Sequence, residues 1–89
     1  MLFTKKELSL FKSDYFKILK IYENYIEIQS LNTEHCWIIQ KTQSKPMVVL
    51  HHKHLLQDKY YHKHYYGRTT KDAYKQIISH DAYVLSISR

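Results

Sequence analysis

The chain has 89 residues, of which 44% are hydrophobic and 15% aromatic, with one cysteine and a formal net charge of +6. This length predicts a single domain, residues 1–89, without room for a large internal active-site cavity. The lone Cys36 excludes an intramolecular disulfide framework, and no apolar run reaches the ~18 residues that a membrane span needs. Because the chain start also lacks a secretion signal, we expect a cytoplasmic protein with no membrane partner.

The positive charge is concentrated in the second half of the chain. Residues 1–44 contain six lysines against five acidic residues, a net charge of +1, whereas residues 45–89 contain six lysines and two arginines against three aspartates, a net charge of +5. A basic half with interleaved aromatic residues favours polyanionic partners, through Coulomb attraction and counterion release. The excess of lysine over arginine weakens this interpretation, since arginine is the residue that grips phosphates bidentately.

A capping box predicts the first helix. Thr4 can act as the N-cap, and Glu7 occupies the third helical position, so each side chain can bond the other residue's backbone N–H. Phe3 and Leu8 have the spacing of a hydrophobic staple around the same helix start. We expect a short helix over about residues 5–12.

Aromatic and β-branched residues with alternating polarity predict an antiparallel meander after this helix. In the second strand Ile26 and Ile28 are expected to face the core while Glu27 and Gln29 meet water, and Trp37 is expected to be a main core residue of the third strand. The expected strands cover residues 15–22, 25–30, 36–41 and 47–54, with a loop over residues 42–46 before the last of them.

One longer amphipathic helix is predicted near the C-terminus. Thr69 and Asp72 have capping-box spacing at its start. We expect the helix to end at His80 and Asp81, and residues 82–87 to form a short final strand. The apolar stripe that would pack across the sheet consists of Ala73 and Ile77 with Tyr74 or Ile78. The whole pattern predicts an α+β fold: a short N-terminal helix, a meander of four to five antiparallel strands and one helix packed across the sheet.

The stretch from Pro46 to Arg68 is chemically unusual, since it holds five of the seven histidines and four of the nine tyrosines. Four of its histidines are candidate ligands for a zinc or nickel ion: His52, His54, His62 and His64. If residues 55–59 join two antiparallel strands, a register that pairs His52 or His54 with His62 gathers all four imidazoles on one face. A shift by one residue would separate them, and the spacing matches no recognised zinc motif, so a metal site is an alternative hypothesis.

The same stretch has the residue types that contact single-stranded nucleic acid. Cationic side chains would meet phosphates, and tyrosine rings would stack on unpaired bases. The residues to which we assign these contacts are Lys53, Lys63, Arg68, Tyr61 and Tyr65. Tyrosine is also favoured in strands without any ligand, so an ordinary structural role stays open for these rings. The main functional expectation is a non-catalytic protein that contacts nucleic acid or a nucleoprotein.

Two further functional classes remain as alternatives. A protein-interaction module, acting as an inhibitor, regulator or accessory subunit and including a homodimer, would use a sheet edge or the tyrosine-rich surface. A small ribonuclease would use His62, Lys63 and His64, or His80 with Asp81, as acid, base and cation. No spacing identifies a catalytic pair, and Cys36 beside His35 makes only a weak nucleophile–base pair. We therefore do not expect an enzyme, and apart from the zinc or nickel ion we expect no cofactor.

Overall fold

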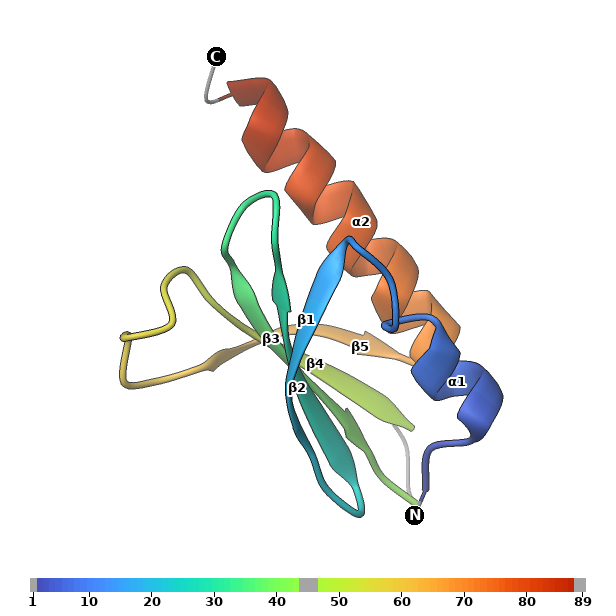
Figure 1. Cartoon of the computed structure of the whole chain (residues 1–89). Coiled ribbons are helices and arrows are strands. Elements are labelled where there is room, and N and C mark those ends of the chain that lie inside the picture. The colour runs from blue at the N-terminus through green and yellow to red at the C-terminus, as the bar shows by residue number, and fades with distance from the viewer. Residues whose placement is uncertain (1, 44–46, 88–89) are drawn as a thin grey trace.

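The structure is a computed structural model that describes residues 2–43 and 47–87. It has the predicted α+β fold, with a short helix, a meander sheet and a long helix packed on the sheet (Figure 1). The elements are α1 (Lys5–Ser9), β1 (Phe16–Ile21), β2 (Tyr25–Ser30), β3 (Cys36–Lys41), β4 (Val48–Lys53), β5 (His62–Gly67) and α2 (Thr70–Ile87). Of the loop predicted over residues 42–46, residues 44–46 lie outside the described part of the chain.

Helix α1 begins with the predicted capping box. The Thr4 hydroxyl accepts from the Glu7 backbone N–H at 3.1 Å, and the Glu7 carboxylate accepts from the Thr4 N–H at 2.9 Å. The helix ends at Ser9, earlier than predicted, and the chain continues in a turn to Phe11. The Lys41 ammonium group lies 3.0 Å from the Glu7 carboxylate, so this short helix is also tied to the end of β3.

The five strands form one antiparallel sheet in the order β1-β2-β3-β4-β5. Each strand pairs with its neighbour in sequence, as short connections favour. Bulges interrupt the pairing of β1 with β2 and of β4 with β5. In the second of these, His51 lies opposite Lys63 while the adjacent Leu50 lies opposite Tyr65, so His64 is the extra residue of β5.

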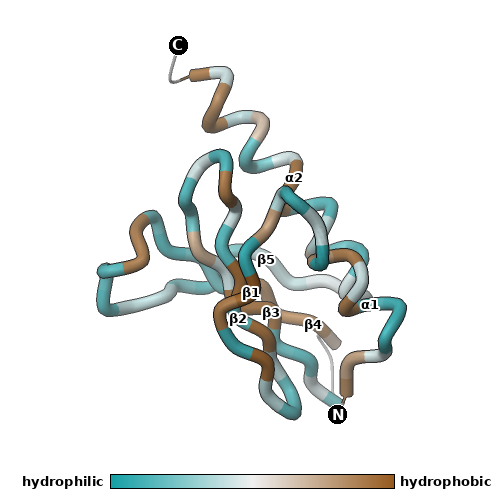
Figure 2. The backbone as a smooth tube through the Cα atoms, in the orientation of Figure 1, coloured by the Kyte–Doolittle hydropathy of each residue, from teal (hydrophilic) through white to brown (hydrophobic). Residues whose placement is uncertain are grey.

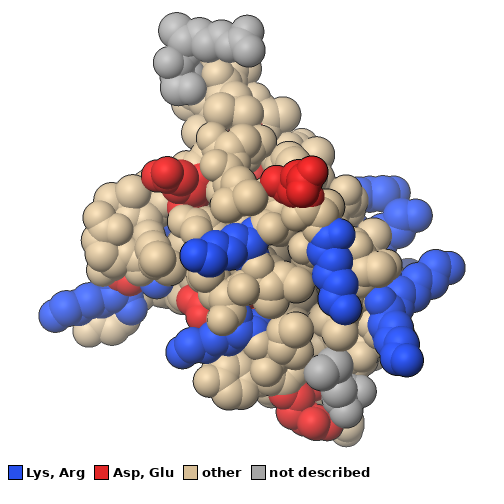
Figure 3. All heavy atoms as spheres, viewed as in Figure 1, with Lys and Arg blue, Asp and Glu red and all other residues tan. Residues whose placement is uncertain are grey.

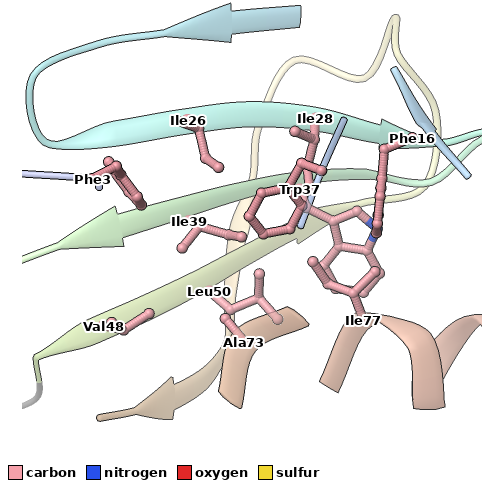
Figure 4. Packing of buried hydrophobic residues seen from close by; sticks show 11 residues of the cluster. Phe3, Phe16, Ile26, Ile28, Trp37, Ile39, Val48, Leu50, Ala73 and Ile77 are labelled. Atoms are coloured by element: carbon pink, nitrogen blue, oxygen red, sulfur yellow. The ribbon is translucent and has the colours of Figure 1, made fainter. Parts of the chain in front are cut away.

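The hydrophobic core lies on one face of the sheet, beneath both helices. Figure 4 shows Ala73 and Ile77 of α2 directed at the sheet side chains around Trp37, and the apolar segments meet in the middle of the molecule in Figure 2. Phe11 from the segment after α1 packs against Tyr74 of α2, with ring centroids 6.0 Å apart, so both helices cover the same face. The fully buried core residues include Ile28, Trp37, Ile39, Val48, Leu50, Ala73 and Ile77.

Helix α2 begins as predicted but does not end as predicted. Thr69 and Asp72 form a reciprocal cap, with backbone-to-side-chain distances of 3.1 and 3.2 Å. The predicted end at His80 and Asp81 and the predicted strand over residues 82–87 are wrong, because the helix continues to Ile87.

Two physical reasons account for the longer helix. No glycine or proline lies between Thr70 and Ile87 to end it. Asp81, which the sequence places near a helix end, instead points inward and accepts hydrogen bonds from Tyr15 and Thr33. The last turns therefore extend past the sheet, as Figure 1 shows, and leave Tyr83 and Ile87 exposed.

Candidate histidine metal site

Five imidazoles meet on the helix-covered face, at one end of the sheet. We call this group the histidine cluster, and it consists of His35 from the β2–β3 turn, His52 from β4, His54 just after β4, His64 from β5 and His80 from α2. The His52 ring is central, with its centroid 4.7–5.3 Å from the centroids of the other four. Four segments of the chain thus contribute one side chain type to one place.

Sheet register and strand alternation place the strand histidines His52, His62 and His64 on the helix-covered face. Trp37 of β3 pairs with His52, which in turn pairs with His62 of β5, so these side chains share the helix-covered face. A β-bulge re-aims the side chains of the strand that carries it. Here the bulge at His64 places Tyr65 opposite Leu50 on this face, whereas His64 already lies on the side of His62 by strand alternation. The His64 ring lies 5.4 Å from the Trp37 ring and 5.0 Å from the His80 ring.

His80 reaches the cluster because it continues the inward stripe of α2. It follows Ile77 by three residues and Ala73 by seven, which is one helical face. Its ring packs edge-on against Trp37, with centroids 5.2 Å apart. The turn before β3 brings His35 to the same place, and Glu34 beside it has φ 65°, the only non-glycine positive φ among the described residues.

The buried Asp81 carboxylate connects the two elements that carry His35 and His80. It is 0% exposed, and it accepts from the Tyr15 hydroxyl at 2.7 Å and from the Thr33 hydroxyl at 2.9 Å. The Thr33 oxygen in turn accepts from the His35 backbone N–H at 3.2 Å. Burial and the hydrogen bond to Asp81 raise the pKa of Tyr15 to about 12. We call this network of Tyr15, Thr33 and Asp81 the Asp81 clamp.

The ring nitrogens have the arrangement of a metal-binding group. One nitrogen from each of His35, His52 and His80 lies within 4.8 Å of the others, and we call these residues the histidine triad. His35 Nδ1 and His52 Nε2 are 2.9 Å apart and share one proton in a hydrogen bond. His80 Nδ1 is buried and has no hydrogen-bond partner among the described residues. A buried nitrogen of this kind costs stability until it is satisfied, and a bound cation is one group that can satisfy it.

The environment keeps the imidazoles of the triad and of His64 in the neutral form that binds metals. Burial, and then the neighbouring imidazoles, lower the pKa of His52 to about 3. Burial is also the main cause of the lowered pKa values of His35, His64 and His80, with a smaller contribution from nearby histidines. Because a protonated imidazole cannot coordinate a metal, these groups offer their lone pairs at neutral pH without first losing a proton.

The donor set fits a divalent ion of the zinc, nickel or copper type. Imidazole is a good ligand for these ions, and Zn–N bonds are about 2.0–2.1 Å long. Two ligands of a tetrahedral ion are then about 3.3 Å apart, so nitrogens that now lie within 4.8 Å of one another have to approach by at most about 1.5 Å. His54 and His64 lie beside the triad and are candidates for a fourth ligand position. Cys36 is not a candidate ligand, because its side chain lies on the opposite sheet face and its sulfur contacts the Glu34 carbonyl oxygen.

The structure brings together most of the histidines predicted as metal ligands. The register is one of the two considered, with His52 opposite His62, and the His52 ring contacts those of His54, His62 and His64. His62 is exposed and lies farthest from His52, with a centroid distance of 5.8 Å. Whether these residues bind a metal stays a prediction.

The residues predicted to contact nucleic acid do not form one surface. Lys53 is only 8% exposed, with its ammonium group 4.6 Å from the centre of the Tyr61 ring and donating to the Asp58 carbonyl oxygen. The Tyr61 hydroxyl donates to Glu27 at 2.6 Å, and Tyr65 packs against the core. Lys63 and Arg68 are exposed. Figure 3 likewise shows the cationic side chains of one view spread around the molecule, with acidic groups between them.

Two residues considered for catalysis, Asp81 and Cys36, are buried in the structure. Asp81 is occupied by Tyr15 and Thr33, so it is not the orienting partner of His80. Cys36 is buried, and burial raises the pKa of its thiol, which disfavours the reactive thiolate.

Sequence reasoning missed His35 and His80 as candidate ligands. The signal for His80 is present in the sequence, since the helical period that aligns Ala73 with Ile77 also aligns His80. The signal for His35 is weaker, because its position depends on the pairing of β3 with β4, which places it next to His54 with ring centroids 4.9 Å apart.

Comparison of the chain with protein-family models, with curated proteins and with solved structures finds no match. No helix of the described residues combines the length and apolarity required to cross a membrane. Functional inference for this chain therefore depends on its own residues, and the histidine cluster is the feature with the most specific chemistry.

Proposed function

We propose that this protein binds a divalent transition-metal ion, of the zinc, nickel or copper type, through His35, His52 and His80. The observation that carries the proposal is the convergence of three imidazole nitrogens within 4.8 Å, one of them on His52, which is 2% exposed. Histidines seldom converge in the interior by chance, because burying several imidazoles without hydrogen-bond partners is unfavourable. The lowered pKa values support the same conclusion, since the ligands are neutral when the ion arrives.

The ion would join three separate elements of the fold. His35, His52 and His80 come from the β2–β3 turn, β4 and α2, so coordination would fasten the second half of α2 to the sheet. A ligand that binds only the folded state stabilises it by RT ln(1 + [L]/Kd), which is about 2.7 kcal/mol at a ligand concentration of 100 Kd. The stabilisation therefore provides a readout that is independent of any catalytic activity.

The experiment is a zinc titration of protein that carries no histidine tag, by calorimetry and by thermal unfolding with and without chelator. We expect one ion per chain and a higher Tm with zinc. His35→Ala and His80→Gln should each weaken binding at least tenfold, whereas His51→Ala should have no such effect, because His51 lies on the opposite sheet face and bonds Gln40. Unchanged Tm and no heat of binding would refute the proposal, as would equal losses in His51→Ala and His80→Gln.

The cytoplasmic location and the nucleic-acid contact expected from the sequence remain proposals. Any nucleic-acid contact would have to use other residues than the five predicted ones, because these are divided between the core, the interior of a loop and the surface.

A further inference from the structure

No helix of the described residues covers the sheet face opposite α1 and α2. We call it the open face, and it includes Lys17, Lys20, Tyr25, Gln40, His51 and Lys63. The pairing register fixes this assignment, since directly opposed residues of antiparallel strands point to the same side. Lys20 is opposite Glu27, Tyr25 is opposite Gln40, and Lys63 is opposite His51. The intervening residues, such as Ile26 and Ile39, are the buried ones under the helices.

A shallow hollow lies in the middle of the open face. It has a volume of about 220 Å³ and is lined by Tyr25, Ile38, Gln40, His51 and Tyr61. Pockets for drug-sized ligands are larger, about 300–1,000 Å³, so this hollow suits a single small group. Its lining combines two aromatic phenol rings, one apolar side chain and two side chains that can donate or accept hydrogen bonds, which is what a planar heterocycle requires.

The walls of the hollow are fixed in place before any ligand arrives. The Tyr61 hydroxyl donates to Glu27 at 2.6 Å, and the buried Lys53 ammonium lies 4.6 Å from the ring centre. The His51 and Gln40 side chains are hydrogen-bonded to each other at 3.1 Å. Across the hollow, Tyr25 stacks on the exposed Tyr22, with ring centroids 4.6 Å apart. Side chains held in this way lose little freedom on binding.

The charges around the hollow favour a polyanion. Lys17 and Lys20 of β1 lie on one side, Lys63 of β5 lies on the other, and all three are exposed. Glu27, which lies opposite Lys20 and accepts a hydrogen bond from the neutral Tyr61 hydroxyl, contributes one negative charge, so the three lysines outnumber it. A face that carries aromatic rings between lysines matches a strand of nucleic acid, whose bases can stack while its phosphates meet the ammonium groups.

We propose that the open face binds single-stranded nucleic acid, with one unpaired base in the hollow between Tyr25 and Tyr61. The strand must be single, because a base in a duplex has both of its faces stacked and its pairing edge occupied. Stacking on tyrosine tolerates any base, and the lysine contacts give no preference, so the site has little sequence specificity. This site shares no residue with the histidine cluster and is independent of the metal proposal.

The test is fluorescence anisotropy with labelled single-stranded RNA and DNA oligonucleotides, each at several salt concentrations and in the presence of chelator. Tyr25→Ala should weaken binding by about 5-fold to 150-fold, and Tyr25→Phe should retain it, because the stacking surface is kept. With three lysines on phosphates, log K should fall with log salt at a slope of about −2, and Lys63→Gln should reduce that slope by about 0.7. A thermal melt of each variant checks that it is folded.

The matched control is Lys75→Gln, which removes an exposed lysine of the same charge from α2, on the other side of the sheet. Unchanged binding in this variant is expected. Equal losses in Lys75→Gln and Lys63→Gln would mean that only net charge matters and would overturn the proposal, as would tighter binding of a duplex or an unchanged affinity of Tyr25→Ala. RNA and DNA strands of one sequence separate the two sources of the same chemistry, since a site without 2′-hydroxyl contacts binds both.

Discussion

Replacing Asp81 by alanine removes the acceptor at the centre of the Asp81 clamp, and we expect a large loss of stability. The carboxylate is 0% exposed and accepts from the Tyr15 hydroxyl at 2.7 Å and the Thr33 hydroxyl at 2.9 Å. Hydrogen bonds to charged groups contribute about 1.5–3 kcal/mol each. Part of that gain is offset in the wild-type protein by the cost of burying the charge. The expected net loss is therefore about 2–4 kcal/mol.

The assay is urea unfolding followed by the fluorescence of Trp37, which lies in the adjacent core, together with a thermal melt. For a chain of this size each kcal/mol lowers Tm by about 4–8 °C, so the alanine variant should melt roughly 10 °C or more below the wild type. The exposed Asp14 provides the control, and Asp14→Ala should change stability by less than about 0.5 kcal/mol. A double-mutant cycle with Tyr15→Phe should give a coupling energy of about 0.5–3 kcal/mol.

A stability change below about 0.5 kcal/mol in Asp81→Ala would refute this reasoning, since it would place the side chain in the class of ordinary surface residues. A zero coupling energy with Tyr15→Phe would leave the burial of Asp81 intact as a cause but would exclude the hydrogen bond between these two side chains.

Three other predictions concern pH, capping and the Tyr61 hydroxyl. The folded-state pKa of His52 is about 3, below its unfolded value near 6.5, so the unfolded chain binds more protons between these values. The contribution of His52 to the stability of the metal-free protein should therefore be fully present above about pH 6.5 and fall by up to about 1.4 kcal/mol per pH unit toward pH 3, and a flat urea midpoint across this window would contradict it. Thr69→Ala should cost about 0.5–2 kcal/mol by chemical denaturation through loss of the α2 cap, and a result equal to that of the exposed Ser79→Ala would argue against the cap. Tyr61→Phe should cost about 1 kcal/mol, because Glu27 loses a hydrogen-bond donor, and no loss would mean that water replaces the hydroxyl.

Local signals predicted the fold because they act within a few residues. The capping boxes at Thr4 and Thr69 and the alternation through Ile26 and Ile28 each need only neighbouring residues, and the structure confirms all of them. The end of α2 was predicted wrongly for the opposite reason. Asp81 resembles a helix-ending residue in sequence, but its hydrogen bonds to Tyr15 and Thr33 come from segments 66 and 48 residues away.

The candidate metal site depended on both kinds of information. The chain itself shows that His52, His54, His62 and His64 can share a face, since strand alternation is a local property. It cannot show the bulge at His64, which places Tyr65 opposite Leu50 and against the core, because a bulge is a property of the pairing between two strands.

The amino-acid sequence by itself determined the starts of both helices, the first four strands with their apolar faces, and the presence of a histidine-rich and tyrosine-rich stretch. Only the tertiary structure decided which histidines meet, because His35 and His80 join His52 through sheet register and helix docking. It also decided that Lys53 and Tyr61 pair with each other instead of facing water together. The physical reason is that contacts between distant segments depend on how whole elements pack, and no local pattern encodes that geometry.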